Sequence, residues 1–268
     1  MIADIFAILD LGSTDATFVS QAKRFADARE ARLRIGVAAP VHALETSLAL
    51  AGGYALPTDL ERCAGEKEAE IVAGLTGEGI PVSVGTFEGE PAVLDRALVA
   101  QARVADLTLV GPPAAYADRA FRRRLLENLA LHSGRPVLAL PESGIPDHPA
   151  TVVLAWNGSR EAARALNDVL ALVDRRTYFD VVEVCDDADR HDLDAVCAHL
   201  QARGHGAAGH HLAGKGEPTD HLLAFAHRQR ADLLAVGAYG RTRLSEMLLG
   251  GVTRDLIAGA TMPVLFSH

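Results

Sequence analysis

The sequence is poor in aromatic residues and in cysteine. Phe, Trp and Tyr make up 5% of the 268 residues, so a core must be built mainly from Ala, Val, Leu and Ile. Such residues suit parallel strands that are buried on both faces of a sheet. The cysteines, Cys63, Cys185 and Cys197, are odd in number and form no CxxC pair. This argues against a disulfide framework or a zinc ribbon.

Long hydrophobic runs and an excess of basic residues are also missing. No apolar stretch approaches the roughly 18 residues that suggest a membrane-spanning helix. Residues 1–12, MIADIFAILDLG, lack a basic leader, and we expect them to form a buried strand rather than a signal peptide. The formal net charge of −9 argues against general binding to nucleic acid or to an anionic membrane. We therefore expect a cytoplasmic protein with neither kind of partner.

Strand signals alternate with helix signals along the whole chain. Expected strands in the first half are 2–11, 33–39, 82–87, 106–110 and 137–140, with helices following Ser13 and near 58–75, 91–103 and 117–131. Expected strands in the second half are 151–155, 178–184, 209–213, 233–236 and 264–266, with helices between them. This alternation is typical of βαβ units and predicts parallel sheets.

The two halves repeat each other in order. Asp10-Leu-Gly-Ser resembles Trp156-Asn-Gly-Ser, the segment 105–111 resembles 231–237, and Pro136-Val-Leu resembles Pro263-Val-Leu. Residues 141–149 hold three prolines and a glycine and are expected to be a linker. The matches favour a duplication, with a first domain over 1–142 and a second over 150–268.

Glycines follow the strand at 232–236. Gly237 and Gly240 come directly after it, and Gly250-Gly251-Val-Thr253 then open a helix. Glycine allows a backbone to approach a ligand closely, and a helix N-terminus offers unpaired N–H groups to an anion. The Thr253 hydroxyl could donate as well, and Arg241 and Arg243 could screen phosphate charge. The alternative is ordinary turn chemistry, and neither a GK[ST] loop nor a G-x-G-x-x-G pattern is present.

At this point the sequence resembles the universal stress protein family, as two tandem copies. The family's nucleotide motif, G-x2-G-x9-G followed by Ser or Thr, fits Gly237, Gly240 and Gly250, with Gly251 in place of the hydroxyl residue. The resemblance implies an adenine-nucleotide alpha-hydrolase-like α/β fold. Each copy would then be an open five-stranded parallel sheet, in the order 3-2-1-4-5, flanked by helices. It also implies that the last strands of the two copies pair as a pseudo-dimer, and a homodimer is a further expectation.

The resemblance implies an adenine nucleotide site in the second copy, for ATP with or without Mg²⁺. The expected binding residues are Ala155, Trp156, Asn157, Val184, Gly237, Tyr239, Gly240, Arg241, Gly250, Gly251, Val252 and Thr253. Asn157 stands where the family usually has Asp, so it brings no carboxylate for a metal. Trp156 could stack on a base or be a buried aromatic at a strand end.

The first copy departs further from the motif. After its fourth strand it reads Gly111-Pro-Pro-Ala, and prolines remove N–H donors from the turn. Counting back from the shared Pro-Val-Leu places Arg123 and Arg124 opposite Gly250 and Gly251. We expect these side chains to fill the phosphate space, so that the first copy has lost its site. The alternatives are that four arginines of this stretch form a solvated helix face or bind some other anion: Arg119, Arg122, Arg123 and Arg124.

Other chemistry receives little support from the sequence. His210 and His211 are neighbours on an expected strand and should point to opposite faces, while His191 and His199 should share one face of a helix. We therefore expect no metal site. Ser13 and Ser159 fit helix N-caps rather than nucleophiles.

The resemblance thus implies a stress-response protein in which ATP binding acts as a sensor or regulator, without efficient catalysis. The alternatives are a nucleotide-free interaction scaffold and a slow ATPase.

Overall fold

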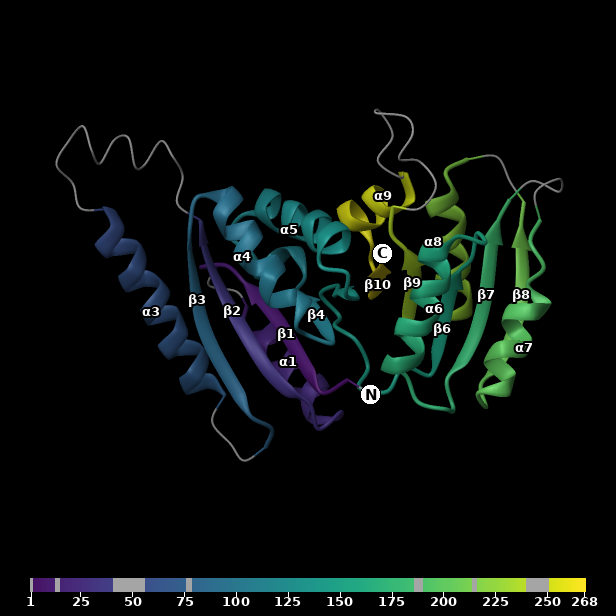
Figure 1. The fold of residues 1–268 in the computed structure, drawn as a ribbon, viewed down its shortest axis with the longest axis horizontal. Coiled ribbons are helices and arrows are strands. Elements are labelled where there is room, and N and C mark those ends of the chain that lie inside the picture. The colour runs from purple at the N-terminus through teal and green to yellow at the C-terminus, as the bar shows by residue number, and fades with distance from the viewer. Residues whose placement is uncertain are drawn as a thin grey trace. The chain divides into compact units, whose positions relative to one another are not determined.

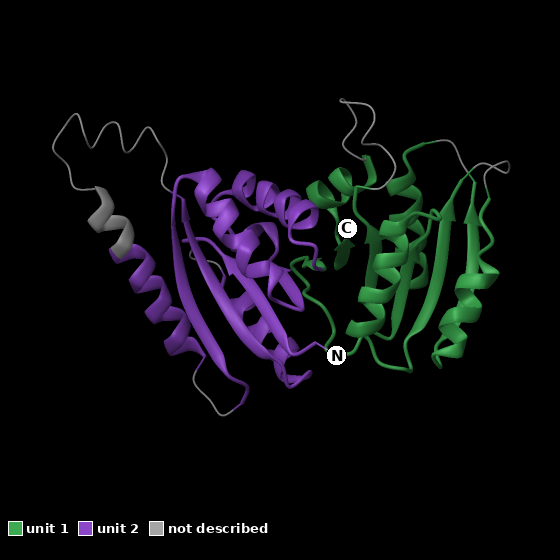
Figure 2. Cartoon of the chain, viewed as in Figure 1, with its two compact units in different colours: residues 1, 136–268 green, residues 2–135 purple. Residues whose placement is uncertain are grey.

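The chain forms two compact α/β units. The computed structural model describes residues 2–12, 15–40, 56–75, 79–185, 190–213, 216–239 and 251–268. Residues 2–135 make up unit 2, and residues 136–268 make up unit 1 (Figure 2). Among the described residues, no helix has both the length and the apolar character needed to cross a membrane.

Unit 2 is built from a parallel sheet with helices on both faces. Its elements are β1 (Asp4–Leu9), α1 (Ala16–Asp27), β2 (Arg32–Pro40), α3 (Leu56–Gly74), β3 (Val82–Gly89), α4 (Pro91–Arg103), β4 (Leu107–Val110), the 3₁₀ turn η1 (Pro113–Ala115) and α5 (Arg119–His132). The strand order is β3-β2-β1-β4, and each neighbouring pair is parallel. Helices α1 and α3 share one face of this sheet, and α4 and α5 share the other (Figure 1).

Unit 1 repeats this arrangement. Its elements are β5 (Val137–Ala139), β6 (Thr151–Ala155), α6 (Arg160–Leu172), β7 (Tyr178–Val184), α7 (Asp194–Ala202), β8 (Gly206–Leu212), α8 (Pro218–Gln229), β9 (Leu233–Gly237), α9 (Gly251–Gly259) and β10 (Val264–Ser267). The order β8-β7-β6-β9-β10 is parallel throughout, which is the predicted order 3-2-1-4-5. Right-handed crossovers put α6 and α7 on one face and α8 and α9 on the other (Figure 1).

Buried aliphatic strands form the core of each unit. All six residues of β1 are buried, and so are all four of β4 and of β10. Most residues on both faces of these strands are apolar, because helices cover both sides of a parallel sheet. The predicted fold class is therefore confirmed, and the scarcity of aromatic residues fits its Val, Leu and Ile core.

The short strand β5 belongs to unit 1, although it closes the first repeat in sequence. It runs antiparallel to β10, with Leu138 opposite Leu265 and Val137 opposite Phe266. Within unit 1, the last strand of one repeat is thus hydrogen-bonded to the last strand of the other.

Helix α7 starts later than the histidine spacing suggested. It begins at Asp194, where the side chain of Asp192 accepts a hydrogen bond from the Asp194 N–H at 2.9 Å. His191 lies before this helix, so the prediction that His191 and His199 share a helix face is wrong. His210 and His211 do point to opposite faces: His210 contacts Asp180, whereas His211 contacts the His191 carbonyl.

Candidate functional site

A pocket lies at the carboxyl ends of the strands in unit 1. It has a volume of about 260 Å³ and is lined from five segments of the chain. The lining residues are Ala155, Trp156, Asn157, Val182, Val184, Pro218, Leu222, Val236, Gly237, Tyr239, Gly251, Val252 and Thr253. Strands β6 and β9 are neighbours here, and their crossovers leave in opposite directions. Ligands bind at such a switch point in open α/β sheets.

Nine of the twelve residues predicted from the sequence line this pocket. They are Ala155, Trp156, Asn157, Val184, Gly237, Tyr239, Gly251, Val252 and Thr253. The other three, Gly240, Arg241 and Gly250, lie outside the described residues, as does Arg243.

Four lining residues were missed by the sequence analysis: Val182, Pro218, Leu222 and Val236. Val182 and Val236 had a usable signal, because each lies within two residues of the end of its strand, and the last residue of each strand was predicted to line the site. Val182 lies two residues before Val184, on the same face of β7. Leu222 and Pro218 are four residues apart on α8, so they share a helix face.

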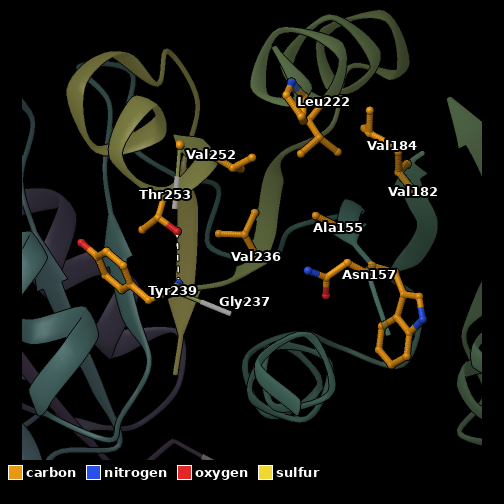
Figure 3. Close-up of a pocket in the computed structure, with 13 residues that line it drawn as sticks. Ala155, Asn157, Val182, Val184, Leu222, Val236, Gly237, Tyr239, Val252 and Thr253 are labelled. Atoms are coloured by element: carbon orange, nitrogen blue, oxygen red, sulfur yellow. Dashed lines mark hydrogen bonds between the residues drawn. The ribbon is translucent and has the colours of Figure 1, made fainter. Parts of the chain in front are cut away.

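One wall of the pocket is apolar. Ala155 pairs with Val182 across β6 and β7, and Val184, Leu222 and Val236 converge on the same hollow (Figure 3). The lining residues within the described part of the chain carry no ionisable acid or base of the Asp, Glu, His, Lys or Arg type. An apolar pocket with a few polar groups is typical of small-molecule sites, and its volume is just below the usual range of roughly 300–1,000 Å³.

The first turn of α9 faces the pocket. Gly251, Val252 and Thr253 all line it, and the first N–H groups of a helix have no partner inside the helix. The helix dipole adds partial positive charge at this end. This turn can therefore bind an anionic group.

Two amides that follow β9 are already paired within the protein. The Ala238 N–H donates to the Ser267 carbonyl at 2.7 Å, and the Tyr239 N–H donates to Thr253 Oγ1 at 3.3 Å (Figure 3). Tyr239 adopts a left-handed backbone conformation, with φ of 58°. The Thr253 hydroxyl accepts this bond and keeps its own proton for donation.

Packing against α6 accounts for Gly237. A Cβ at this position would lie 2.6 Å from both the Ala162 nitrogen and the Glu161 carbonyl carbon. The end of β9 thus touches the backbone of the first turn of α6. Glycine is required here for helix–strand packing, whatever the pocket binds.

The turn after β6 positions Asn157. Its Oδ1 accepts hydrogen bonds from the Ser159 N–H at 3.2 Å and from the Ser159 hydroxyl at 2.6 Å. Ser159 Oγ in turn accepts from the Ala162 N–H at 3.1 Å, which confirms Ser159 as the N-cap of α6. Gly158 between them has φ of 66°, a conformation that favours glycine.

The buried carboxylate of Glu183 binds His191, whose ring lies against this turn. Glu183 accepts hydrogen bonds from the His191 N–H at 2.9 Å and from His191 Nδ1, and His211 Nε2 lies 3.3 Å from Glu183 Oε2. Burial opposes ionisation, but the His191 bonds outweigh it and hold the pKa of Glu183 below its ordinary value. The His191 ring lies so close to Gly158 that a side chain on Gly158 would clash with it.

The corresponding strand end in unit 2 is filled by the unit's own groups. Asp10, at the end of β1, is 3% exposed. Its Oδ1 accepts from the Gly12 N–H at 2.8 Å and the Ala117 N–H at 3.1 Å, and its Oδ2 accepts from the Asp118 N–H at 3.1 Å. The carboxylate therefore orders the loop after η1.

Tyr116 and Arg122 complete this closure. The Tyr116 hydroxyl donates to the Ile8 carbonyl at 2.6 Å, and burial raises the pKa of Tyr116, so the donor proton stays in place. Arg122 is buried and its Nε donates to the Gly111 carbonyl at 2.7 Å.

The arginines named from the sequence lie elsewhere. Arg123 pairs with Glu127 at 3.1 Å, and Arg124 pairs with Asp95 at 3.0 Å. The prediction that they occupy the phosphate space of unit 2 is therefore wrong, and Arg122 is the buried arginine of this segment. Counting back from the Pro-Val-Leu segment at Pro136 identified the correct helix, α5, but selected arginines on a different face of it from Arg122.

Comparison with known proteins agrees with this architecture. Residues 150–268 match the model of the universal stress protein family. Universal stress proteins MJ0531 and MJ0577 of Methanocaldococcus jannaschii are 39% identical over 51 residues and 36% identical over 50 residues. Each match covers 19% of this chain, and only 30% and 31% of those relatives.

Solved structures resemble the chain over nearly its whole length. A universal stress protein from Archaeoglobus fulgidus aligns with a TM-score of 0.68 at 17% identity, covering 98% of this chain and 95% of its own. A putative universal stress protein from Pseudomonas aeruginosa aligns at 0.58 and 13% identity, covering 99% and 93%. At such identities the likeness shows the fold, whereas the family match rests on the second half. Residues 150–268 therefore resemble the universal stress protein family, and the solved structures show that the whole chain shares their fold.

Proposed function

We propose that unit 1 binds an adenine nucleotide, ATP, in the pocket at the carboxyl ends of β6, β7 and β9. One observation carries the proposal: nine residues predicted from the sequence, drawn from four separate segments, line a single pocket. Sequence separation alone would not bring Ala155, Val184, Gly237 and Thr253 together. The open α/β topology does, because all of them lie at one end of one sheet.

The proposal assigns the two ends of the ligand to different walls. The adenine ring goes to the apolar wall formed by Ala155, Val182, Val184 and Leu222, which suits a flat and weakly polar group. The phosphates go to the first turn of α9, where N–H groups and the helix dipole favour negative charge. Trp156 also lines the pocket and is half-buried, so its ring is a candidate to stack on the base.

Binding would serve as a signal rather than as a step in catalysis. A ligand that binds only the folded state stabilises it by about 2.7 kcal/mol when its concentration is a hundred times its Kd. The stability of the folded state would thus follow the concentration of the nucleotide. This is the expected role in a stress response.

Equilibrium dialysis of the full chain with labelled ATP tests the proposal. Val252→Glu is the informative variant, because a carboxylate in the first turn of α9 favours the helix but repels the phosphates. We expect Val252→Glu to weaken ATP binding at least tenfold, about 1.4 kcal/mol. Val252→Gln, with the same size and no charge, should lose much less. Equal losses in both variants, or no ATP binding by the unaltered protein at millimolar nucleotide, would contradict the proposal.

The second candidate is an interaction scaffold that binds no nucleotide. One observation favours it: the amides of Ala238 and Tyr239 are used inside the protein and cannot serve a phosphate. The dialysis experiment separates the two candidates, since a scaffold would retain no ATP.

A further inference from the structure

The polar groups of the pocket are unsuited to a divalent cation. Proteins bind Mg²⁺ at nucleotide sites through one or two carboxylates, together with the phosphates. None of the described lining residues carries a carboxylate or an imidazole. Their side-chain polar groups come only from Trp156, Asn157, Tyr239 and Thr253. Nor do the described parts of the chain contain a group of three His, Cys, Asp or Glu side chains that could hold a metal ion.

Asn157 contains the one side-chain amide oxygen in this set, and the turn after β6 already uses it. The Ser159 backbone N–H can only donate, so the atom that faces it at 3.2 Å must be the oxygen of Asn157. The Ser159 hydroxyl adds a second bond to the same atom at 2.6 Å. The amide group therefore turns its NH₂ away from Ser159, and NH₂ groups repel cations and attract anions.

The carboxylate at the matching position of unit 2 does not supply a cation site either. Asp10 accepts three backbone hydrogen bonds and is buried. The strand end beside the pocket, in unit 1, thus carries the Asn157 amide. The equivalent strand end in unit 2 carries the Asp10 carboxylate, and both of its oxygens accept hydrogen bonds from the unit's own backbone.

We propose that unit 1 binds its nucleotide as the metal-free anion, so that affinity does not depend on Mg²⁺. This inference rests on the proposed function and adds the form in which the ligand is recognised. The donors available to the phosphates are N–H and O–H groups: the first turn of α9, the Thr253 hydroxyl and the Asn157 amide. Such donors bind free phosphate oxygens best, and Mg²⁺ would compete with them for the same oxygens.

Dialysis of the full chain against labelled ATP, in millimolar Mg²⁺ and separately in EDTA, tests this inference. We expect the Kd in EDTA to be equal to or lower than the Kd in Mg²⁺. Asn157→Asp keeps an oxygen for Ser159 and adds a second one, so it should gain Mg²⁺ dependence, with about tenfold tighter binding in Mg²⁺ than in EDTA. Asn157→Ala lacks both oxygens and should remain independent of Mg²⁺.

The outcomes separate this inference from the function on which it rests. Binding by the unaltered protein that weakens tenfold or more in EDTA would overturn metal-free recognition and leave the proposed function intact. Absence of binding in both buffers would overturn the two together. Mg²⁺ dependence in Asn157→Ala equal to that in Asn157→Asp would also overturn the role given to this side chain.

Discussion

At the scale of single residues, Gly237 and Gly251 differ although both border the pocket. A Cβ on Gly237 would meet the backbone of Glu161 and Ala162. Among the residues that the structure describes, a Cβ on Gly251 would meet only Asp255 Oδ2, at the ordinary distance of 3.9 Å. The glycine motif therefore combines a packing requirement with a position that tolerates a side chain. The family's hydroxyl residue at the second position would fit here without strain.

We expect Gly237→Ala to lower the free energy of unfolding of unit 1 by about 2–3 kcal/mol, because backbone atoms cannot yield to the new methyl group. Gly251→Ala should be neutral or stabilising by up to about 1 kcal/mol, since alanine favours a helix over glycine. The sequence has a single tryptophan, Trp156, so urea unfolding followed by its fluorescence reports on unit 1. A similar loss in both variants would contradict the packing argument.

At the scale of elements, α5 and α9 follow the fourth strand of their repeats but meet it differently. In unit 2, α5 brings the Arg122 guanidinium to the carbonyl of Gly111 at the end of β4. In unit 1, the first turn of α9 brings backbone groups and the Thr253 hydroxyl to the end of β9. A buried arginine closes one strand end, and small residues leave a pocket at the other.

Replacing Arg122 should reveal its structural role. We expect Arg122→Ala to destabilise the protein by about 2 kcal/mol, because the buried Gly111 carbonyl loses its partner and the arginine stem loses its packing. Arg123→Ala, the matched control one residue away, removes an exposed ion pair and should cost less than about 0.5 kcal/mol. Thermal unfolding followed by far-UV circular dichroism compares the two. Equal shifts would show that Arg122 is not the closing residue.

The order of strands and helices was predictable because the hydrophobic pattern and the repeats specify it. The shared Pro-Val-Leu and Gly segments aligned the two halves, and the resemblance to a family supplied the strand order. Contacts between side chains were harder to predict, as α5 shows. One position along a helix turns a side chain by about 100°, so counting from Pro136 selected Arg123 and Arg124 rather than Arg122.

A local signal was nevertheless available in α5. Phe121, Leu125, Leu126 and Leu129 form its buried stripe, and Arg122 lies on that stripe at helical spacing. The hydrogen bonds of the Ala238 and Tyr239 amides could not be foreseen, by contrast. They join the residues after β9 to β10 and α9, which lie far away in the sequence.

At the scale of the whole molecule, the two copies of the fold differ at the carboxyl ends of their strands. The chain has a formal net charge of −9, so its overall field repels nucleotides and any affinity must come from local donors. In unit 2 the backbone N–H groups of Ala117 and Asp118 donate to Asp10, whereas the first turn of α9 in unit 1 faces a pocket. We therefore expect one nucleotide site in each chain.

A titration of the full chain with ATP, followed by Trp156 fluorescence, tests this claim most directly. Trp156 is the single tryptophan and lines the pocket, so we expect a saturable change in its emission that ends at one ATP per chain. Dialysis at the same protein concentration should give the same stoichiometry. Bound ATP that leaves the emission of Trp156 unchanged, or a stoichiometry of two per chain, would contradict a single site in unit 1.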